Sequence, residues 1–597
     1  MINSQTACGL DCYDACKIVF KDDKLNGDKT HPVGDGSLCS LINRTIENEK
    51  RIEIPTIDGK EVTMSEALNA VVGAFKEDSS LLWRGSGNMG VMQEVSNLFM
   101  HKIEATLTKG SLCDGAGDRG IELGRGVNRV LSLEQIKNAD TVVVWGRNIT
   151  VTNSHIVPYL DGKEVVVIDP VETAIAQKAN FHLQIKPRTD FYIAILLARF
   201  LFMEDSQDEE WLDEFAPEYD DFYDFTRDFR IKPILEYCET DIGEMGKILN
   251  YLRDKKVVFL VGLGVQKYST GASTIQAIDA LAATLGLFGK EGCGVHYLSN
   301  SKLGFHNPFK VNCKEVPKAT VEFSNFKTVL VQGGNPAESM PNSLKVQNEL
   351  NSVKNLIYFG LYENETSKRA NIVIPAKNFF EKEDVRLSYG HQFVNKMNTI
   401  KETNIGISEY DFTKYLFDAF NFDGLKSEKD YIDSWLNQCK KDKEGNYLSP
   451  AYEPLPYKNG FGENGDDEFE FIDEYDDDFM NLKQFKNIRT NSKNRDTDEK
   501  FWLITPKSKN SLNTQFKREN RVTLNPELGF KESEVVRVSS PYGSIELEAH
   551  LSTSIRKDCV LITSNTLGVN NLTPPILSNE GNNACYQEVK VEVESIG

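Results

Sequence analysis

The sequence predicts an α/β protein with two doubly wound domains and a C-terminal barrel-like β domain. Three observations support this fold class. Buried β-branched runs that end in glycine turns recur along the middle of the chain, helical patterns separate them, and the last hundred residues are short strands divided by turns. At 597 residues the chain is too long for one core, so we expect about three or four domains.

The first forty residues contain four of the eleven cysteines, in the frame Cys8-x3-Cys12-x3-Cys16-x22-Cys39. Three closely spaced thiolates and a distant fourth are typical of a chain that binds a four-iron, four-sulfur cluster, because each iron needs one protein sulfur. A structural zinc site also takes four cysteines, usually as two short knuckles. Disulfides are the third alternative. The spacing favours the 4Fe-4S cluster and leaves both alternatives open.

After the cysteines, a helix is expected over 64–75 with Ser65 as its N-cap, followed by a strand over 80–83 and a glycine loop over 85–90. The same order of strand and glycine turn recurs farther along the chain, in the strands that end at Trp145, Val261 and Gln332, and another strand, 164–169, ends in the acid Asp169. Continuous β-branched strands indicate a parallel sheet covered on both faces. An acid at the carboxyl end of such a strand commonly receives a ribose or base.

Charge and composition exclude several classes of function. The net charge of −21 disfavours nucleic acid as a partner. No apolar stretch reaches the roughly twenty residues that span a bilayer, and no targeting segment precedes Cys8, so we expect a cytoplasmic protein with reduced thiols and no direct membrane insertion. The acidic run Asp466–Asp478 is expected to be a solvated or disordered linker.

Together these features resemble the molybdenum and tungsten oxidoreductases of the dimethyl sulfoxide reductase class, over nearly the whole chain. Beside the cysteine frame, the resemblance rests on motifs in the family's order: Trp145-Gly146-Arg147-Asn148 with Asn153 and His155, Asp169-Pro170-x-Glu172-Thr173, Pro187-Arg188-Thr189-Asp190, Gly333-Gly334-Asn335-Pro336-Ala337-Glu338, Glu365-Thr366, Ala370–Pro375, Glu381, Thr514-Gln515-Phe516, Asn525-Pro526 and Asn570-Asn571-Leu572-Thr573. It implies a 4Fe-4S domain at 1–55, a discontinuous α/β domain at 56–108 and 310–424 interleaved with a second at 109–309, an acidic linker or insertion at 425–497, and a dinucleotide-binding β-barrel at 498–597.

In that family the metal, molybdenum or tungsten, is held between two molybdopterin guanine dinucleotides. The resemblance assigns one dinucleotide to Gly146, Asn148, Asp169, Thr173 and Asp190, the other to Gly333, Asn335 and Glu338, and adds Gln515, Asn571 and Thr573 from the barrel. Glycine turns let backbone N–H groups approach a pyrophosphate. For Asp169 the alternative is a helix N-cap.

The loop 109–117 resembles the cysteine-ligated branch of the family, which makes Cys113 the implied ligand of molybdenum or tungsten. A lone cysteine is more often a buried apolar residue. Asp114, His155 and His306 are the titratable groups expected near the metal, with an ordinary polar loop role as the alternative for each.

The sequence also departs from the family. Leu41 stands where the family has a lysine between cluster and pterin, Asp114 follows Cys113 where formate dehydrogenases have a histidine, Ile149 follows Asn148 in place of proline, and Arg188 replaces a usual glycine. We expect a two-electron oxidoreductase that acts on a small substrate, with formate disfavoured by Asp114, and that exchanges electrons with a ferredoxin-like or iron-sulfur partner. The alternative is a non-catalytic subunit related to the large iron-sulfur subunit of respiratory complex I.

Overall fold

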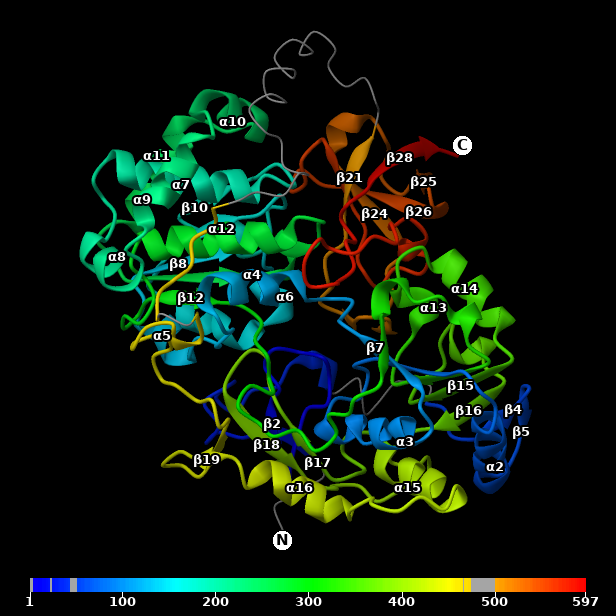
Figure 1. Ribbon diagram of the computed structural model, residues 1–597. Coiled ribbons are helices and arrows are strands. Elements are labelled where there is room, and N and C mark those ends of the chain that lie inside the picture. The colour runs from blue at the N-terminus through cyan, green and yellow to red at the C-terminus, as the bar shows by residue number, and fades with distance from the viewer. Residues whose placement is uncertain (1–3, 22–23, 43–50, 465–466, 474–499, 597) are drawn as a thin grey trace. The chain divides into compact units, whose positions relative to one another are not determined.

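The computed structural model of the chain describes residues 4–21, 24–42, 51–464, 467–473 and 500–596. It divides into two compact units, each made of segments far apart in sequence (Figure 1). The first unit consists of Met1–Gly110, Ser301–Tyr452 and Ser508–Arg518, and the second of Ser111–Asn300, Glu453–Lys507 and Glu519–Gly597.

The first unit is built on an eight-stranded sheet in the order β13-β7-β6-β14-β15-β16-β4-β5. Its strands are β4 (Thr56–Ile57), β5 (Lys60–Glu61), β6 (Ser80–Arg84), β7 (Thr106–Lys109), β13 (Lys314–Pro317), β14 (Thr328–Gln332), β15 (Asn355–Gly360) and β16 (Ile372–Pro375). The strands from β13 to β16 are parallel, and β4 and β5 form an antiparallel edge. The chain leaves β6 towards β7 and leaves β14 towards β15, so the topological switch point lies between β6 and β14.

The helices of the first unit are α2 (Met64–Phe75), α3 (Ser96–Lys102), α13 (Pro336–Ser339), α14 (Ser343–Ser352), α15 (Glu409–Ala419) and α16 (Glu428–Leu436). Helices α2, α3 and α15 share a hydrophobic core with strands of this sheet. The predicted helix over 64–75 is confirmed, but the prediction of Ser65 as its N-cap is wrong. Thr63 caps the helix, because its hydroxyl accepts from the Glu66 N–H (3.2 Å) while the Glu66 carboxylate accepts from the Thr63 N–H (2.8 Å), the reciprocal pair of a capping box.

The cysteine frame lies on a small antiparallel sheet in the first unit, formed by β1 (Ser4–Ala7), β2 (Lys17–Lys21) and β3 (Lys24–Gly27). A second sheet of four strands follows the order β17-β18-β20-β19. Its strands are β17 (Asp384–Arg386), β18 (Phe393–Met397), β19 (Lys440–Lys441) and β20 (Tyr447–Leu448). The hairpin of β22 (Ser511–Leu512) and β23 (Gln515–Phe516) also belongs to this unit.

The second unit contains a five-stranded parallel sheet in the order β10-β9-β8-β11-β12. Its strands are β8 (Thr141–Trp145), β9 (Glu164–Ile168), β10 (Phe181–Leu183), β11 (Val257–Val261) and β12 (Gly294–His296). Its helices are α4 (Ala116–Arg125), α5 (Leu133–Asn138), α6 (Ile149–Thr152), α7 (Asp190–Met203), α8 (Glu209–Phe215), α9 (Tyr219–Arg227), α10 (Ile231–Cys238), α11 (Ile242–Leu252) and α12 (Gly271–Thr284). No helix in the described part of the chain is long and apolar enough to span a membrane.

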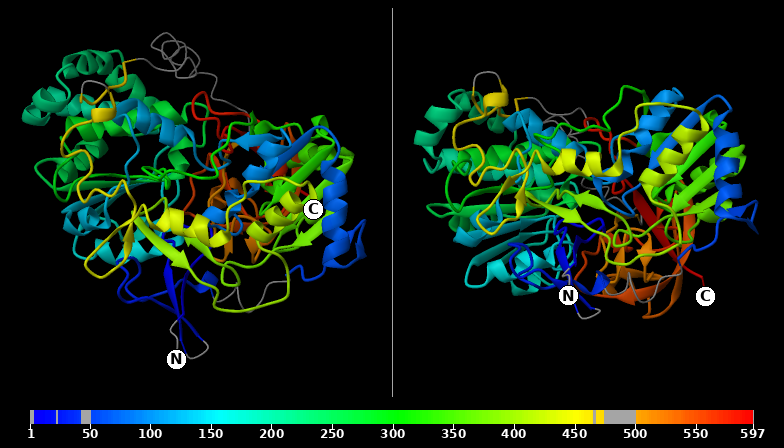
Figure 2. Two further views of the ribbon diagram at one scale, coloured as in Figure 1. Left: turned by 60° about the horizontal axis from the view of Figure 1, so that its bottom comes forward. Right: turned by 90° about the horizontal axis from the view of Figure 1, so that it is seen from below.

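The closed β-barrel expected at the C-terminus is confirmed in the second unit (orange to red in Figures 1 and 2). Its strands follow the order β21-β27-β24-β26-β25-β28, with bounds Phe501–Ile504 (β21), Arg521–Leu524 (β24), Val535–Ser540 (β25), Gly543–Leu551 (β26), Cys559–Leu561 (β27) and Lys590–Ser595 (β28). Alternate buried positions, such as Val536 and Val538, fill its interior.

Two described parts of the stretch 425–497, expected to be an acidic linker or insertion, pack against their units. Its first part carries α16, whose Trp435 side chain is completely buried. Within the second unit the Phe471 ring stacks on Phe222 with centroids 4.4 Å apart, and Phe469 stacks on Phe288 at 5.7 Å. Residues 467–473 therefore pack through their aromatic side chains, while the remaining residues of the acidic run, 466 and 474–478, lie outside the described residues.

Candidate functional site

The switch point of the first unit is lined by glycines that follow β6 and β14. A Cβ atom on Gly85 would lie 2.5 Å from the Gly333 carbonyl oxygen, a distance that no side chain tolerates. Gly333 has φ +58°, in the left-handed region that favours glycine. The Gly87 N–H donates to the Gly333 carbonyl (2.9 Å). The two loops can therefore approach each other only as glycines, at the carboxyl ends of parallel strands where α/β sheets bind nucleotides.

Two buried donors beside this switch point have no hydrogen-bond partner among the described residues. They are Nε2 of Gln93 and Nε1 of Trp83. Nε2 of Gln93 lies 3.3 Å from the position that a Cβ on Gly333 would take, and the Trp83 ring packs against Gly334. A buried donor without an acceptor is costly. Oxygen atoms of a bound phosphate would satisfy such donors, so the residues present fit an anionic ligand.

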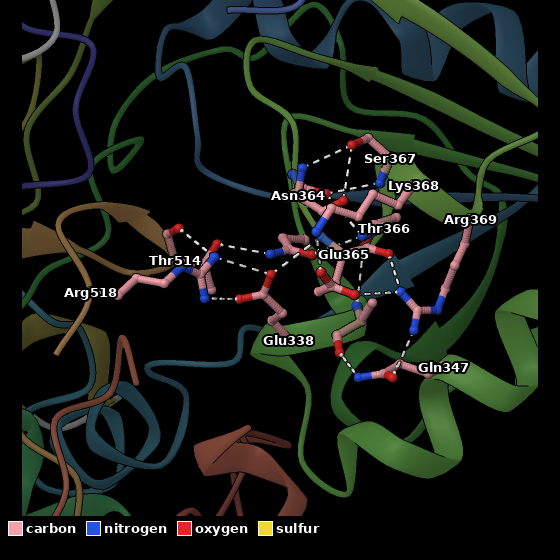
Figure 3. A network of polar contacts seen from close by, with 12 residues as sticks. Glu338, Gln347, Asn364, Glu365, Thr366, Ser367, Lys368, Arg369, Thr514 and Arg518 are labelled. Carbon is pink, nitrogen blue, oxygen red and sulfur yellow. Dashed lines mark hydrogen bonds and ion pairs between the residues drawn. The ribbon is translucent and has the colours of Figure 1, made fainter. Parts of the chain in front are cut away.

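A closed polar network surrounds the predicted residues Asn335 and Glu338 (Figure 3). Asn335 Oδ1 accepts from the Thr366 N–H (3.2 Å) and hydroxyl (2.9 Å), and its Nδ2 donates to the Thr514 hydroxyl (3.1 Å). The Arg518 guanidinium donates to both oxygens of Glu338 (2.5 and 3.1 Å). Arg518 was missed from the sequence because it lies 180 residues from its partner, and its only local signal was its place two residues after Thr514-Gln515-Phe516.

Gln515 reaches the same switch point from the β22–β23 hairpin. Its Nε2 donates to the Gly87 carbonyl oxygen (3.2 Å). The sequence placed this residue in the barrel, but residues 508–518 belong to the first unit. The barrel position predicted for Gln515 is therefore wrong, although its contact with a glycine loop agrees with a role at the crevice.

The second unit has an equivalent switch point between β8 and β11. Gly146 has φ +56°. A Cβ on Gly262 would lie 2.2 Å from the Gly146 carbonyl oxygen, so close packing of these two turns also requires glycine. Asn148 follows in the same loop and accepts from the Thr150 hydroxyl (2.7 Å), which fixes the start of α6.

Two buried carboxyl groups lie near this second switch point. Burial raises the pKa of Asp169 to about 7, and the nearby carboxyl of Asp190 adds to that rise. Burial likewise raises the pKa of Asp190 to about 6, although Nε1 of Trp145 donates to it (2.8 Å). Asp169 accepts from the Val171 N–H (2.9 Å) two residues on, which is a local turn rather than the helix N-cap considered as its alternative. The Thr173 hydroxyl accepts from the Ala176 N–H (3.4 Å).

The loop that carries Cys113 is fixed through its backbone. Gln266 Nε2 donates to the Cys113 carbonyl (2.5 Å), Lys267 Nζ donates to the Leu112 carbonyl (3.2 Å), and the Ser111 hydroxyl lies 3.0 Å from the Cys113 sulfur. The Cys113 thiol is exposed. Polar contacts therefore hold the backbone and leave the thiol exposed, which does not agree with a buried apolar role.

Asp114 stands beside Cys113 and can hold a proton. Burial first, and the Asp118 carboxylate second, raise its pKa to about 6. The Tyr297 hydroxyl (3.0 Å) and the Gly115 N–H (2.8 Å) donate to the same oxygen of Asp114. A carboxyl group with such a pKa exchanges protons near neutral pH.

The remaining predicted residues occupy less informative places. His155 is buried in the short helical turn Ser154–Leu160 of the second unit. His306 is exposed in the first unit, where its backbone N–H donates to Gln438 (2.6 Å). The buried Thr573 hydroxyl donates to the Asn570 side chain (3.2 Å), and Asn571 is half-buried beside it. These contacts give no direct indication of a ligand role.

The four cysteines of the N-terminal frame gather in one loop system of the first unit. The Cys8 N–H donates to the Cys16 carbonyl (2.9 Å). Burial, followed by the charge of Cys39, raises the pKa of Cys8 to about 12. Burial likewise raises the pKa values of Cys12 and Cys16 well above the ordinary thiol value, and the other frame cysteines contribute to both. Because burial disfavours the charged form of these cysteines, they would be stable as thiolates only with a positive charge beside them.

The Arg386 guanidinium donates hydrogen bonds to three backbone carbonyls of the same loop, those of Cys8 (3.0 Å), Leu10 (3.0 Å) and Cys12 (3.3 Å). All eleven cysteines are free thiols. Within the described ranges no three His, Cys, Asp or Glu side chains converge on a single metal ion. A cubane presents a separate iron to each thiolate, so a donor set of four cysteines fits it without such convergence.

The chain thus contains two glycine-lined switch points in parallel sheets, a closed β-barrel and an exposed cysteine. Residues 51–405, more than half of the chain, match the molybdopterin oxidoreductase family, and residues 501–590 match the molybdopterin dinucleotide binding domain. The chain therefore belongs to the molybdopterin oxidoreductase family and is a molybdopterin-dependent oxidoreductase.

Its relatives span several activities. A probable oxidoreductase of Bacillus subtilis, YyaE, is 26% identical over 64% of this chain and 63% of its own length, so that match covers less than two thirds of the relative. A second, YoaE, is 23% identical over 99% of this chain and 98% of its own length. The F420-dependent formate dehydrogenase subunit alpha of Methanocaldococcus jannaschii is 22% identical over 76% and 74%.

Among solved structures, acetylene hydratase from Pelobacter acetylenicus superimposes with a TM-score of 0.78 over 99% of this chain and 100% of that chain, at 13% identity. An identity this low supports the fold alone. The fold class predicted from the sequence, with its two α/β domains and β-barrel, is thereby confirmed.

Proposed function

We propose that this chain is a two-electron oxidoreductase of a small substrate that binds molybdenum or tungsten between two molybdopterin guanine dinucleotides. The observation that carries the proposal is the pair of glycine-lined switch points, one in each unit. In the proposed enzyme Cys113 is the metal ligand, and Cys8, Cys12, Cys16 and Cys39 bind a 4Fe-4S cluster. A ferredoxin-like or iron-sulfur partner in the cytoplasm then receives the electrons.

When bound, the metal and its pterins supply the two-electron chemistry, and the cluster supplies one-electron relay. The protein contributes position and charge. The glycine turns and the Gln93 amide would bind the pyrophosphate of a dinucleotide, and the carboxyl groups of Asp169 and Asp190 would accept hydrogen bonds from its base. Gln266 and Lys267 hold the loop that presents the Cys113 sulfur, and Asp114 holds a proton beside it.

Metal analysis of anaerobically purified protein tests the cofactor content. We expect about four irons and one molybdenum or tungsten per chain, with guanine nucleotide released on denaturation. One zinc per chain without iron would contradict the cluster. Iron without molybdenum, tungsten or pterin would contradict the proposed catalysis and favour the complex I-like alternative.

Replacing Cys113 with alanine tests the metal ligand. Because pterin binding is spread over many contacts and the cluster cysteines lie in another segment, iron and pterin contents should not change. The molybdenum or tungsten paramagnetic signal should change, and turnover should fall at least about a hundredfold. The matched control is Cys313→Ala, which removes a half-buried thiol of the first unit. A Cys113→Ala protein with the wild-type signal and activity would remove Cys113 from the site.

A further inference from the structure

Asp11 stands between Cys8 and Cys12 and accepts hydrogen bonds from three other segments of the first unit. Its Oδ2 accepts from the Ser86 hydroxyl (2.8 Å) in the glycine loop and from Nδ2 of Asn513 (3.0 Å) in the β22–β23 hairpin. Its Oδ1 accepts from the Tyr389 hydroxyl (2.9 Å) between β17 and β18. One carboxylate therefore joins the cysteine loop to three pieces of chain that are remote in sequence.

A backbone contact runs beside this side-chain link. The Met89 N–H in the glycine loop donates to the Gly9 carbonyl in the cysteine loop (2.7 Å). Position 9 requires glycine, because an added Cβ there would lie 2.5 Å from Cβ of Phe379. The hairpin that supplies Asn513 also supplies Gln515, whose amide binds the Gly87 carbonyl. The cysteine loop and the loop 85–90 are thus fixed in register at two adjacent points.

We propose that Asp11 is a positioning residue that sets the register between the cysteine loop and the glycine loop and places a fixed negative charge beside the cluster. This inference rests on the proposed function. Leu41 occupies the place where the family resemblance leads us to expect a lysine, so the polar link between the two loops here is a carboxylate instead of a cation. A negative charge near a cluster disfavours its reduced form, because reduction adds a further negative charge.

Asp11→Asn tests the charge, since it keeps the shape but removes the negative charge and one acceptor oxygen. In a potentiometric titration of the whole enzyme followed by the cluster's paramagnetic signal, the ratio of reduced to oxidised cluster at a fixed potential should rise at least about tenfold, equal to about 59 mV for one electron. Iron content should not change. The control Asp35→Asn removes an exposed carboxylate from the same region at φ +43°, which asparagine tolerates, and should shift the ratio by less than about twofold.

Hydrogen exchange tests the register separately. Asp11→Asn and Ser86→Ala should both speed amide exchange at Met89 and across 85–90, because each weakens the link that keeps the Gly9 contact closed. Ser86→Ala keeps the charge and should leave the cluster potential unchanged. Wild-type exchange in Asp11→Asn, or a cluster ratio within twofold of wild type, overturns the assignment. If the wild-type protein binds no iron, the proposed cluster fails, and the exchange result alone decides whether Asp11 positions the loops.

Discussion

The two units carry equivalent glycine-lined switch points, but the carboxyl groups near these points have different partners. In the first, Glu338 is paired with Arg518, and Asn335 is fully engaged with Thr366 and Thr514. In the second, Asp169 and Asp190 are buried, and neither has an ion-pair partner in the described part of the chain. In the first site a guanidinium of the protein pairs with the carboxylate, whereas in the second site the two carboxyl groups have no cation beside them among the described residues and would gain from donors on a ligand.

The largest expected effect on stability comes from replacing one glycine with alanine at each switch point. Gly85→Ala and Gly262→Ala place a Cβ 2.5 and 2.2 Å from the facing carbonyl oxygens, and backbone cannot yield as a side chain does. Each should lower the free energy of unfolding by about 4 kcal/mol, measured by urea denaturation. Gly246→Ala in α11, where nothing lies within 4 Å of the added Cβ, should instead gain about 0.5–1 kcal/mol. If only one of the two alanine variants lost stability, the two switch points would not be structurally equivalent.

Arg518→Met should make the first site resemble the second. The buried Glu338 carboxylate would lose the guanidinium that pairs with it, at a cost of about 3 kcal/mol in the free energy of unfolding. The double variant with Glu338→Gln should recover most of the loss. The control Lys414→Met breaks an exposed pair with Asp418 and should cost less than about 0.5 kcal/mol. If Arg518→Met and Lys414→Met lowered the free energy of unfolding by similar amounts, burial of the Glu338 pair would not be the cause.

Asp169→Asn should remove a pH dependence that belongs to the second site. The pKa of Asp169 is about 7 in the folded chain and about 3.9 when unfolded. Between these values the folded state binds more protons, so the stability of cofactor-free protein falls as the pH rises from 4 to 7. The variant should gain up to about 4 kcal/mol at pH 8 and little at pH 4, from urea midpoints at each pH. The exposed Asp161→Asn is the control; a gain that does not depend on pH would refute the linkage.

What the sequence could predict follows from how local each feature is. The strands ending at Trp145 and Gln332 carry their own buried β-branched pattern and glycine turns, so they were found where the structure has them. The Glu338–Arg518 pair joins residues with no shared local signal. The hairpin around Gln515 leaves the barrel segment for the first unit, and Phe469 packs although acids surround it. Such features depend on tertiary contacts that periodicity and composition do not contain.

The smallest expected effect concerns Arg188, which replaces the family's usual glycine near the second site. Its backbone has φ +72°, in the left-handed region that glycine adopts without strain. Arg188→Gly should relieve about 1 kcal/mol of strain. It also removes an ion pair with Glu588 (3.0 Å), which is worth up to about 1 kcal/mol.

The two effects of Arg188→Gly should nearly cancel. Glu588 would keep its hydrogen bonds from the Ser269 N–H (2.9 Å) and hydroxyl (3.1 Å), so no buried charge is stranded. Urea midpoints should therefore stay within about 1 kcal/mol of wild type at low salt. Because salt screens the ion pair but not the backbone strain, the variant should gain relative to wild type as salt is raised. A loss above about 2 kcal/mol in the free energy of unfolding would contradict this. It would mean that the Arg188 guanidinium stabilises the Asp190 carboxylate, as Arg518 stabilises Glu338 in the first site.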